Sequence, residues 1–157
     1  MKITIHTDEF MKGMEEAGTD VAQRISQAMV YSCEAIRNAA KERIKKNSGR
    51  IPSSGGNGGP LKESMKNEIS ADNGKGTVTG TVFTNCTYAV YYHEGTGIFS
   101  RTGMGRPDVP WSFRDDLGGW HRTSGMEAHP FLEEAADENR NEIARIFYAY
   151  LTQGGNG

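Results

Sequence analysis

Residues 20–45 read DVAQRISQAMVYSCEAIRNAAKERIK, and this stretch decides the architecture of the chain. Its apolar side chains recur at steps of three and four residues, which places them in one stripe along an α-helix. Thr19 or Asp20 supplies the N-cap, and basic residues crowd the last turns, where positive charge favours the helix dipole. A helix this long exceeds what a small sheet covers, so we expect part of it to contact another subunit. The stripe consists of Val21, Ile25, Ala28, Met29, Cys33, Ile36, Ala39, Ala40 and Ile44.

A second helix is predicted to begin at Pro130, because proline is favoured in the first helical turn. Glu133 and Glu134 lie in that turn, where negative charge matches the dipole. The apolar stripe of this C-terminal helix comprises Leu132, Ala135, Ala136, Ile143, Ile146, Phe147, Tyr150 and Leu151. The chain therefore has a long helix near each end.

The region between the helices is rich in predicted strands. Residues 64–70 form a weak strand candidate, and residues 77–84 alternate, with Val78 and Val82 on one face. An Asn73-Gly74 turn between them is a strong hairpin signal. The aromatic run at 88–93 is predicted as a further strand. A second hairpin is predicted from Trp111-Ser112-Phe113 and Trp120-His121-Arg122.

These elements predict an α+β fold in a single domain spanning residues 1–157. We expect an antiparallel sheet of about four strands, packed by the long N-terminal helix and the C-terminal helix, with an extra β-hairpin. A brief helix is expected at 8–16. The segment 47–60 is expected to be a flexible Gly/Ser-rich loop. Residues 97–110 are expected to form another loop and 154–157 a disordered tail.

Composition narrows the classes of function. A formal net charge of −2 at pH 7 argues against a nucleic-acid-coating protein, which carries a basic patch or stripe. No apolar run reaches the roughly 18 to 20 residues that a membrane span needs, and the first residues show no apolar signal-peptide core. We therefore expect a cytosolic chain with no membrane partner. Its two cysteines, Cys33 and Cys86, are expected to be free thiols.

One group of residues offers candidates for a metal or acid–base site. If residues 88–93 form a strand, side chains adjacent in sequence point to opposite faces, so His93 and Glu94 would point away from each other. No His-Glu-x-x-His pattern occurs. We therefore expect no cofactor or metal, and interpret Glu94 as a polar anchor for the next loop, paired with Arg101 or Arg122. The four candidates are His93, Glu94, His121 and His129.

Aromatic residues allow two interpretations. Tyr88, Tyr91 and Tyr92 suit base stacking, but few basic residues lie nearby, so we expect a packed strand face. Gly95-Thr96-Gly97 lacks the pattern of a phosphate loop and is interpreted as a sharp turn. In the second hairpin, the aromatic residues either anchor a subunit interface or cover a local core, and the sequence leaves both open. The candidate interface residues are Trp111, Phe113, Trp120 and Arg122.

Three short motifs follow one another along the chain: GPLKESM at 59–65, YAVYYHEGT at 88–96, and PFLEEA at 130–135. Their order and spacing, after a long helix with a basic end, resemble the HK97 gp10-like family of bacteriophage neck and tail-completion proteins. The glycine-rich insertion before Leu61 departs from the shorter turn usual in that family. The positions carrying the resemblance are Leu61, Ser64, Tyr88, Ala89, Tyr91, His93, Glu94, Gly95, Thr96, Gly97, Pro130, Phe131, Leu132 and Ala135.

The resemblance implies a structural, non-enzymatic virion component at the phage head–tail junction or tail end. It implies a ring homo-oligomer, with a hexamer matching the tail symmetry, that contacts connector or stopper proteins and the tail terminator or tail tube. DNA would pass through its lumen without specific binding. Such a protein resides in the host cytoplasm during assembly and then in the virion neck or tail. The alternatives are a phage-derived tail-like particle, and a small metal-dependent hydrolase or nuclease using His93, Glu94, His121 and His129.

Overall fold

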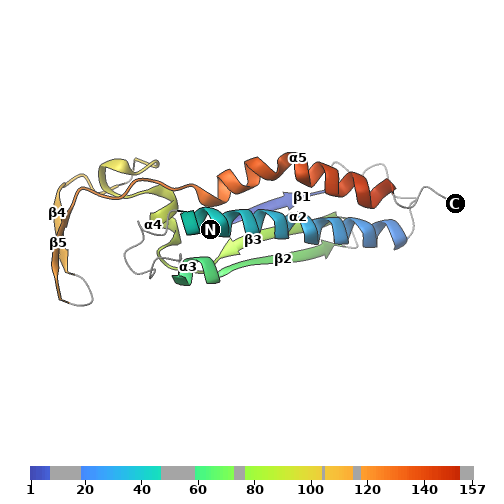
Figure 1. The fold of residues 1–157 in the computed structure, drawn as a ribbon, viewed down its shortest axis with the longest axis horizontal. Helices are drawn as coiled ribbons and strands as arrows, with labels where there is room; N and C mark the ends of the chain where they lie inside the picture. The colour runs from blue at the N-terminus through green and yellow to red at the C-terminus, as the bar shows by residue number, and fades with distance from the viewer. Residues whose placement is uncertain (8–18, 47–58, 73–76, 104, 115–117, 153–157) are drawn as a thin grey trace.

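The computed structural model describes residues 1–7, 19–46, 59–72, 77–103, 105–114 and 118–152. Within these ranges the chain is an α+β protein with an elongated body of two helices on a sheet. A narrow arm leaves one end of that body (Figure 1). The brief helix expected at 8–16, most of the expected 47–60 loop, the Asn73-Gly74 turn and the expected 154–157 tail lie outside the described residues.

The sheet has three antiparallel strands in the order β1-β3-β2 rather than about four. The strands are β1 (Lys2–His6), β2 (Met65–Asp72) and β3 (Thr77–Thr84). The first of them was not anticipated from the sequence, although Ile3 and Ile5 alternate with polar residues in it. β3 is central because both neighbours pair with it: Val82 faces Ile3 of β1 and Asn67 of β2.

One face of the sheet is apolar and the other is polar. In β3 the alternation is complete: Val78, Gly80, Val82 and Thr84 are buried, whereas the residues between them are partly exposed. An antiparallel sheet with one solvated face shows this pattern. The expected placement of Val78 and Val82 on one face is therefore confirmed.

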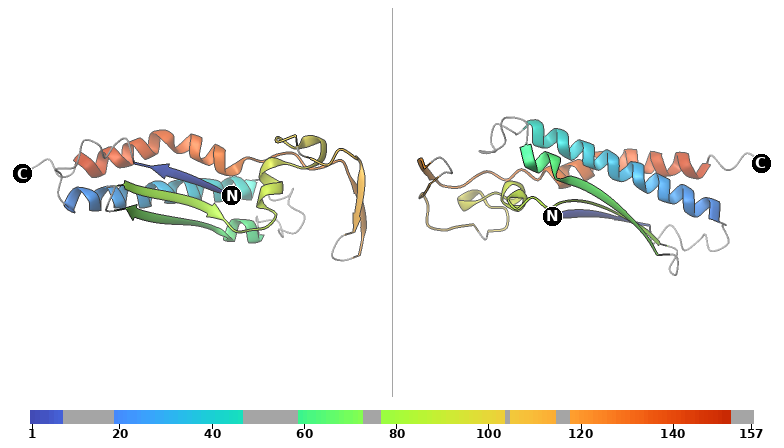
Figure 2. Two further views of the ribbon diagram at one scale, coloured as in Figure 1. Left: turned by 180° about the vertical axis from the view of Figure 1, so that it is seen from behind. Right: turned by 90° about the horizontal axis from the view of Figure 1, so that it is seen from below.

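The buried face of the sheet is covered by α2 (Thr19–Lys46) and α5 (Phe131–Thr152), which lie side by side (Figure 2). α2 packs on β2 and β3, whereas α5 packs beside α2 and contacts β1. Arg43 of α2 joins the two helices by ion pairs to Glu134 and Glu138 of α5. The predicted stripe of α2 supplies much of the core, which includes Ile25, Met29, Cys33, Ile36, Ala40, Ile44, Leu61, Val78, Val82, Phe131, Leu132 and Ala135.

The predicted aromatic strand at 88–93 is wrong, because this segment forms the short helix α4 (Ala89–Glu94). Ala89, Tyr92 and His93 are buried, at helical spacings of three and four residues. Val90 and Tyr91 between them are exposed. That spacing is helical, and a run of six residues is too short for its apolar content alone to distinguish a strand from a helix.

Two further short elements border α4. The helix α3 (Gly59–Glu63) begins within the last two residues of the expected 47–60 loop, buries Leu61 and leads into β2. After Gly95, the segment predicted as a loop contains one 3₁₀ turn, η2 (Gly97–Phe99).

The predicted second hairpin is confirmed and forms the outer part of the arm. β4 (Trp111–Arg114) pairs with β5 (Trp120–Thr123), so that Phe113 faces His121 and Arg114 faces Trp120. We call residues 98–123 the arm. Its hairpin stands away from the helices, beyond the end of the body where α4 lies (Figure 1). No helix in the described ranges is both long and apolar enough to cross a bilayer.

Candidate functional site

The three motif segments meet at the end of the body from which the arm leaves; we call this meeting point the junction. The first and second motifs are joined by a hydrogen bond of 3.1 Å from the Leu61 amide to the Tyr88 hydroxyl. Burial raises the pKa of Tyr88 above its ordinary value. Ser64 Oγ donates to the Leu61 carbonyl at 2.8 Å and lies 2.6 Å from Thr84 Oγ1. The motif residues thus fasten α3 to the end of β3.

The third motif packs onto α4 through aromatic contacts. The ring of Phe131 lies 5.9 Å from that of Tyr92 and 5.4 Å from that of His93, the latter edge-on. The His129 amide donates to the Tyr92 carbonyl at 3.0 Å. Phe131, Leu132 and Ala135 are all buried there. Of the three tyrosines expected to form a packed strand face, Tyr92 is buried in the core from a helix and Tyr88 is partly buried, whereas the expectation is wrong for Tyr91, which is 62% exposed.

The root of the arm consists of two segments that run against each other. The amide of Thr96 donates to the Met126 carbonyl at 2.9 Å, and the amide of Met126 donates to Thr96 Oγ1, also at 2.9 Å. The amide of Ile98 donates to the Ser124 carbonyl at 3.2 Å. The expected turn at Gly95-Thr96-Gly97 is thus also a contact between the outgoing and returning chains.

Glycine is needed in this root because the backbones approach so closely. Gly97 has a φ of +61°, and a Cβ there would lie 2.0 Å from the Ser124 carbonyl oxygen. A Cβ on Gly125 would lie 2.0 Å from the Thr96 carbonyl oxygen. Neither neighbour is a flexible side chain, so any larger residue has to separate the two segments.

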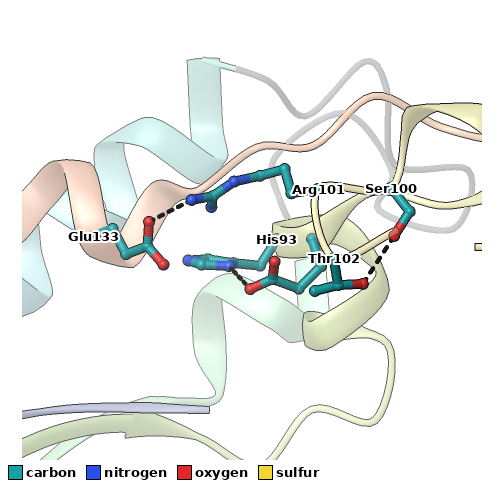
Figure 3. A network of polar contacts seen from close by, with 6 residues as sticks. His93, Ser100, Arg101, Thr102 and Glu133 are labelled. Atoms are coloured by element: carbon teal, nitrogen blue, oxygen red, sulfur yellow. Dashed lines mark hydrogen bonds and ion pairs between the residues drawn. The ribbon is translucent and has the colours of Figure 1, made fainter. Parts of the chain in front are cut away.

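A polar cluster of four side chains closes the junction (Figure 3). His93 Nδ1 lies 2.8 Å from Glu94 Oε1. The expectation that these two side chains point to opposite faces is wrong, because they lie on a helix. Arg101 donates its backbone N–H to the Glu94 carbonyl at 2.8 Å, and its guanidinium pairs with Glu133 at 2.9 Å. That hydrogen bond to Glu133 raises the pKa of Arg101, and the charge on Glu94 adds to the effect.

The expected anchor role of Glu94 is thus altered in detail. Its backbone carbonyl, and not its carboxylate, binds Arg101, while its carboxylate binds His93. Arg122 lies on β5 of the arm, opposite Ser112. Glu133 was not anticipated as a partner, because 40 positions separate it from His93 in the sequence. The only feature of the sequence that pointed to Glu133 was its position within the third motif, in the first turn of α5.

The four residues of the hydrolase alternative do not form one cluster. His121 stacks on Phe113 within the hairpin, with ring centroids 5.3 Å apart. His129 packs against Tyr92, with centroids 4.9 Å apart. His93 and Glu94 share a polar contact, and Glu133 is the third residue whose ligand atom lies near theirs.

The candidate interface residues are on the arm. The Trp120 side chain is 73% exposed and that of Phe113 41% exposed. Trp111 is partly buried and carries the Arg106 guanidinium 5.6 Å from its ring centre. Arg122 is exposed. Trp120 therefore does not cover a local core within the described chain.

A second candidate surface lies along α2 and α5, away from the arm. Tyr31 and Tyr150 stack there with ring centroids 5.6 Å apart. They form a shallow groove together with Glu142, Arg145, Ile146 and Ala149.

No protein-family model matches this chain, and no significant match was found among curated proteins or solved structures.

Proposed function

We propose that this protein is a structural component of a phage head–tail junction or tail end, where it assembles into a ring. The order of the three motifs supports this, since their residues build one junction that positions an arm. The proposed partners are further copies of the chain, the connector or stopper, and the tail terminator or tail tube. DNA passes through the lumen without specific binding.

The observation that carries the proposal is the exposure of Trp120 on a hairpin that projects from the body. An isolated two-stranded hairpin is only marginally stable in water, so a projecting one gains from a partner surface. Trp is also strongly enriched among residues that dominate binding energy. An arm of this kind suits contact with a neighbouring subunit.

The surface that receives the arm is, in our proposal, the groove of Tyr31, Ile146 and Tyr150 on the next copy. Arm and groove are different surfaces, so their contact is heterologous and forms a ring when the rotation between copies closes. The groove offers apolar and aromatic side chains to Trp120. Its Glu142 carboxylate lies 3.6 Å from the Arg145 guanidinium of the same groove, and in the assembled ring it also pairs with Arg122, which is exposed on the arm.

The assembly step is tested with the purified full-length chain and its Trp120→Ala variant. We expect the unchanged protein to form rings in negative-stain images and a concentration-dependent oligomer in sedimentation. The variant should stay monomeric with an unchanged melting temperature, because surface substitutions change stability by about 0.5 kcal/mol or less. Tyr148→Ala is the matched control, since Tyr148 is 72% exposed and does not line the groove. Equal assembly of Trp120→Ala and the unchanged chain would refute the role of the arm.

The biological role is tested by deleting the gene from the genome that encodes it and imaging the lysate. DNA-filled heads beside separate or abnormally ended tails would support the proposal. Normal joined particles would contradict it. Absence of capsid and portal genes beside this gene would favour a tail-like particle over a phage.

A further inference from the structure

His93 is a buried polar residue of α4. Its side chain is buried, with 3% of the residue exposed, yet one ring nitrogen has no hydrogen-bond partner in the described parts of the chain. That atom is Nε2. Buried polar atoms nearly always have partners, so this nitrogen calls for an explanation.

The other ring nitrogen sets the chemical state of Nε2. Nδ1 lies 2.8 Å from Glu94 Oε1, and a carboxylate accepts a hydrogen bond but does not donate one. When the imidazole is neutral, this contact holds its one proton on Nδ1. Nε2 is left with its lone pair, which is the form that binds a metal ion. A carboxylate that orients a histidine in this way is the usual outer partner of a metal-bound imidazole.

Glu133 faces this lone pair. In Figure 3 the ring nitrogen of His93 without a dashed line points toward the Glu133 carboxylate. One ligand atom from each of His93, Glu94 and Glu133 can be chosen so that all lie within 4.8 Å of one another. Atoms bound to a tetrahedral zinc lie about 3.3 Å apart, given bonds of about 2.0–2.1 Å. Metal binding therefore requires the Glu133 carboxylate, whose side chain is 50% exposed, to move toward Nε2.

We propose that His93 Nε2 and the Glu133 carboxylate bind a divalent transition metal of the zinc class, with Glu94 orienting the imidazole. Water completes the coordination. An imidazole ligand favours such ions over magnesium or calcium, which prefer oxygen alone. The sequence had offered His93 and Glu94 as metal-site candidates together with His121 and His129, whereas the site proposed here contains Glu133 and neither of those two histidines.

Arg101 competes with the metal for Glu133. Its guanidinium pairs with that carboxylate at 2.9 Å and places a positive charge beside the site. The start of α5 adds a partial positive charge, which also disfavours a cation. Metal binding thus replaces an existing ion pair, and removal of Arg101 should strengthen it. Stronger metal binding after removal of Arg101 would distinguish a metal site from a purely structural ion cluster. In such a cluster, loss of Arg101 only weakens the junction.

The consequence of the bound metal is a firmer arm. His93 belongs to α4 and Glu133 to α5, and the arm leaves the body between them. A metal coordinated by both residues links the two elements on either side of the root. This inference does not depend on the proposed function, because it concerns binding by the isolated chain.

The test is a titration of tag-free, chelator-treated full-length protein with Zn²⁺, followed by calorimetry, and with Co²⁺, followed by its visible absorption. We expect one ion per chain and no comparable binding of Mg²⁺. Glu94→Gln should weaken binding by roughly 10- to 100-fold, and Glu133→Gln by at least as much. Arg101→Gln should strengthen it by roughly tenfold, through loss of a like charge. Glu134→Gln is the matched control, since Glu134 adjoins Glu133 but pairs with Arg43.

Fold is monitored by circular dichroism, and Glu133→Gln is the decisive variant because its exposed side chain is not needed for packing. The proposal is overturned if Zn²⁺ does not bind below about 1 mM. It is also overturned if Glu133→Gln and Glu134→Gln bind Zn²⁺ equally, or if Arg101→Gln weakens binding. A sulfur-to-cobalt band would assign the metal to Cys33 or Cys86 and would likewise reject the site.

Discussion

Gly80 is where the sheet and the long helix approach most closely, and its replacement by alanine gives a sharp test of the packing. Gly80 lies in the middle of β3, facing α2. A Cβ built there would lie 2.5 Å from Cys33 Sγ and 2.6 Å from Met29 Sδ. Carbon contacts are optimal near 3.5–4.0 Å, so the overlap is about 1 Å. We therefore expect Gly80→Ala to push α2 away from β3 or to displace both sulfur-bearing side chains.

The magnitude follows from two opposing terms. Overpacking of this kind costs about 1–3 kcal/mol, whereas replacing glycine by alanine at a compatible backbone position contributes about 0.4–1 kcal/mol of stability. The net loss in unfolding free energy is about 1–2 kcal/mol. For a chain of this size it lowers the melting temperature by about 2–8 °C. Urea denaturation followed by circular dichroism measures this loss.

A double-mutant cycle with Cys33→Ala identifies the cause. Cys33→Ala alone destabilises by opening a small cavity, but it also makes room for the new methyl group. We expect Gly80→Ala/Cys33→Ala to be more stable than the sum of the single effects by about 1 kcal/mol or more. Additive effects, or a Gly80→Ala variant as stable as the unchanged chain, would refute the close packing of α2 on β3.

Three further predictions concern the core and the junction. Burial raises the pKa of the Cys33 thiol from 9.0 to about 11, so the unfolded state releases this proton first and stability falls as pH rises across that range. At about pH 10 the loss is about 1.4 kcal/mol, and Cys33→Ala should abolish it in urea melts. Tyr88→Phe removes the hydroxyl that accepts a hydrogen bond from the Leu61 amide. We expect it to lower the unfolding free energy by about 1 kcal/mol and to speed hydrogen exchange of that amide. Unchanged exchange would contradict the hydrogen bond. Gly97→Ala should expose the arm to proteolysis while the helices persist; Gly103→Ala, at a similar φ with no atom within 4 Å of its Cβ, should have a smaller effect, and equal sensitivity would refute backbone contact at the root.

Sequence periodicity predicted the long elements well because their physics is local and repeated. The stripe from Val21 to Ile44 spans many turns, so its period could not be mistaken, and the alternation of β3 was equally clear. The aromatic run at 88–93 failed for the opposite reason. Six residues hold too few turns to distinguish the two periods, and the content of tyrosine favoured a strand.

The site was less accessible from the sequence than the fold. The sequence positions of the three motifs were recognised, but the contact between Leu61 and Tyr88 depends on how β2 and β3 place α3 beside the start of α4. The pairing of Arg101 with Glu133 likewise joins an arm segment to a helix that starts after the whole arm. Interactions of this range carry no local pattern, which is why Glu133 could not be assigned to His93 beforehand.

The root of the arm has a mechanical consequence. The chain crosses it twice, and the two crossings are bonded to each other at Thr96 and Ile98. A single connecting segment would let the hairpin rotate about its backbone torsions. Two connecting segments that are hydrogen-bonded to each other restrict that rotation. Torque applied at the hairpin is then delivered to α4 and α5 together. The direction in which the arm leaves the body is therefore set by the packing of α4 and α5 at the root.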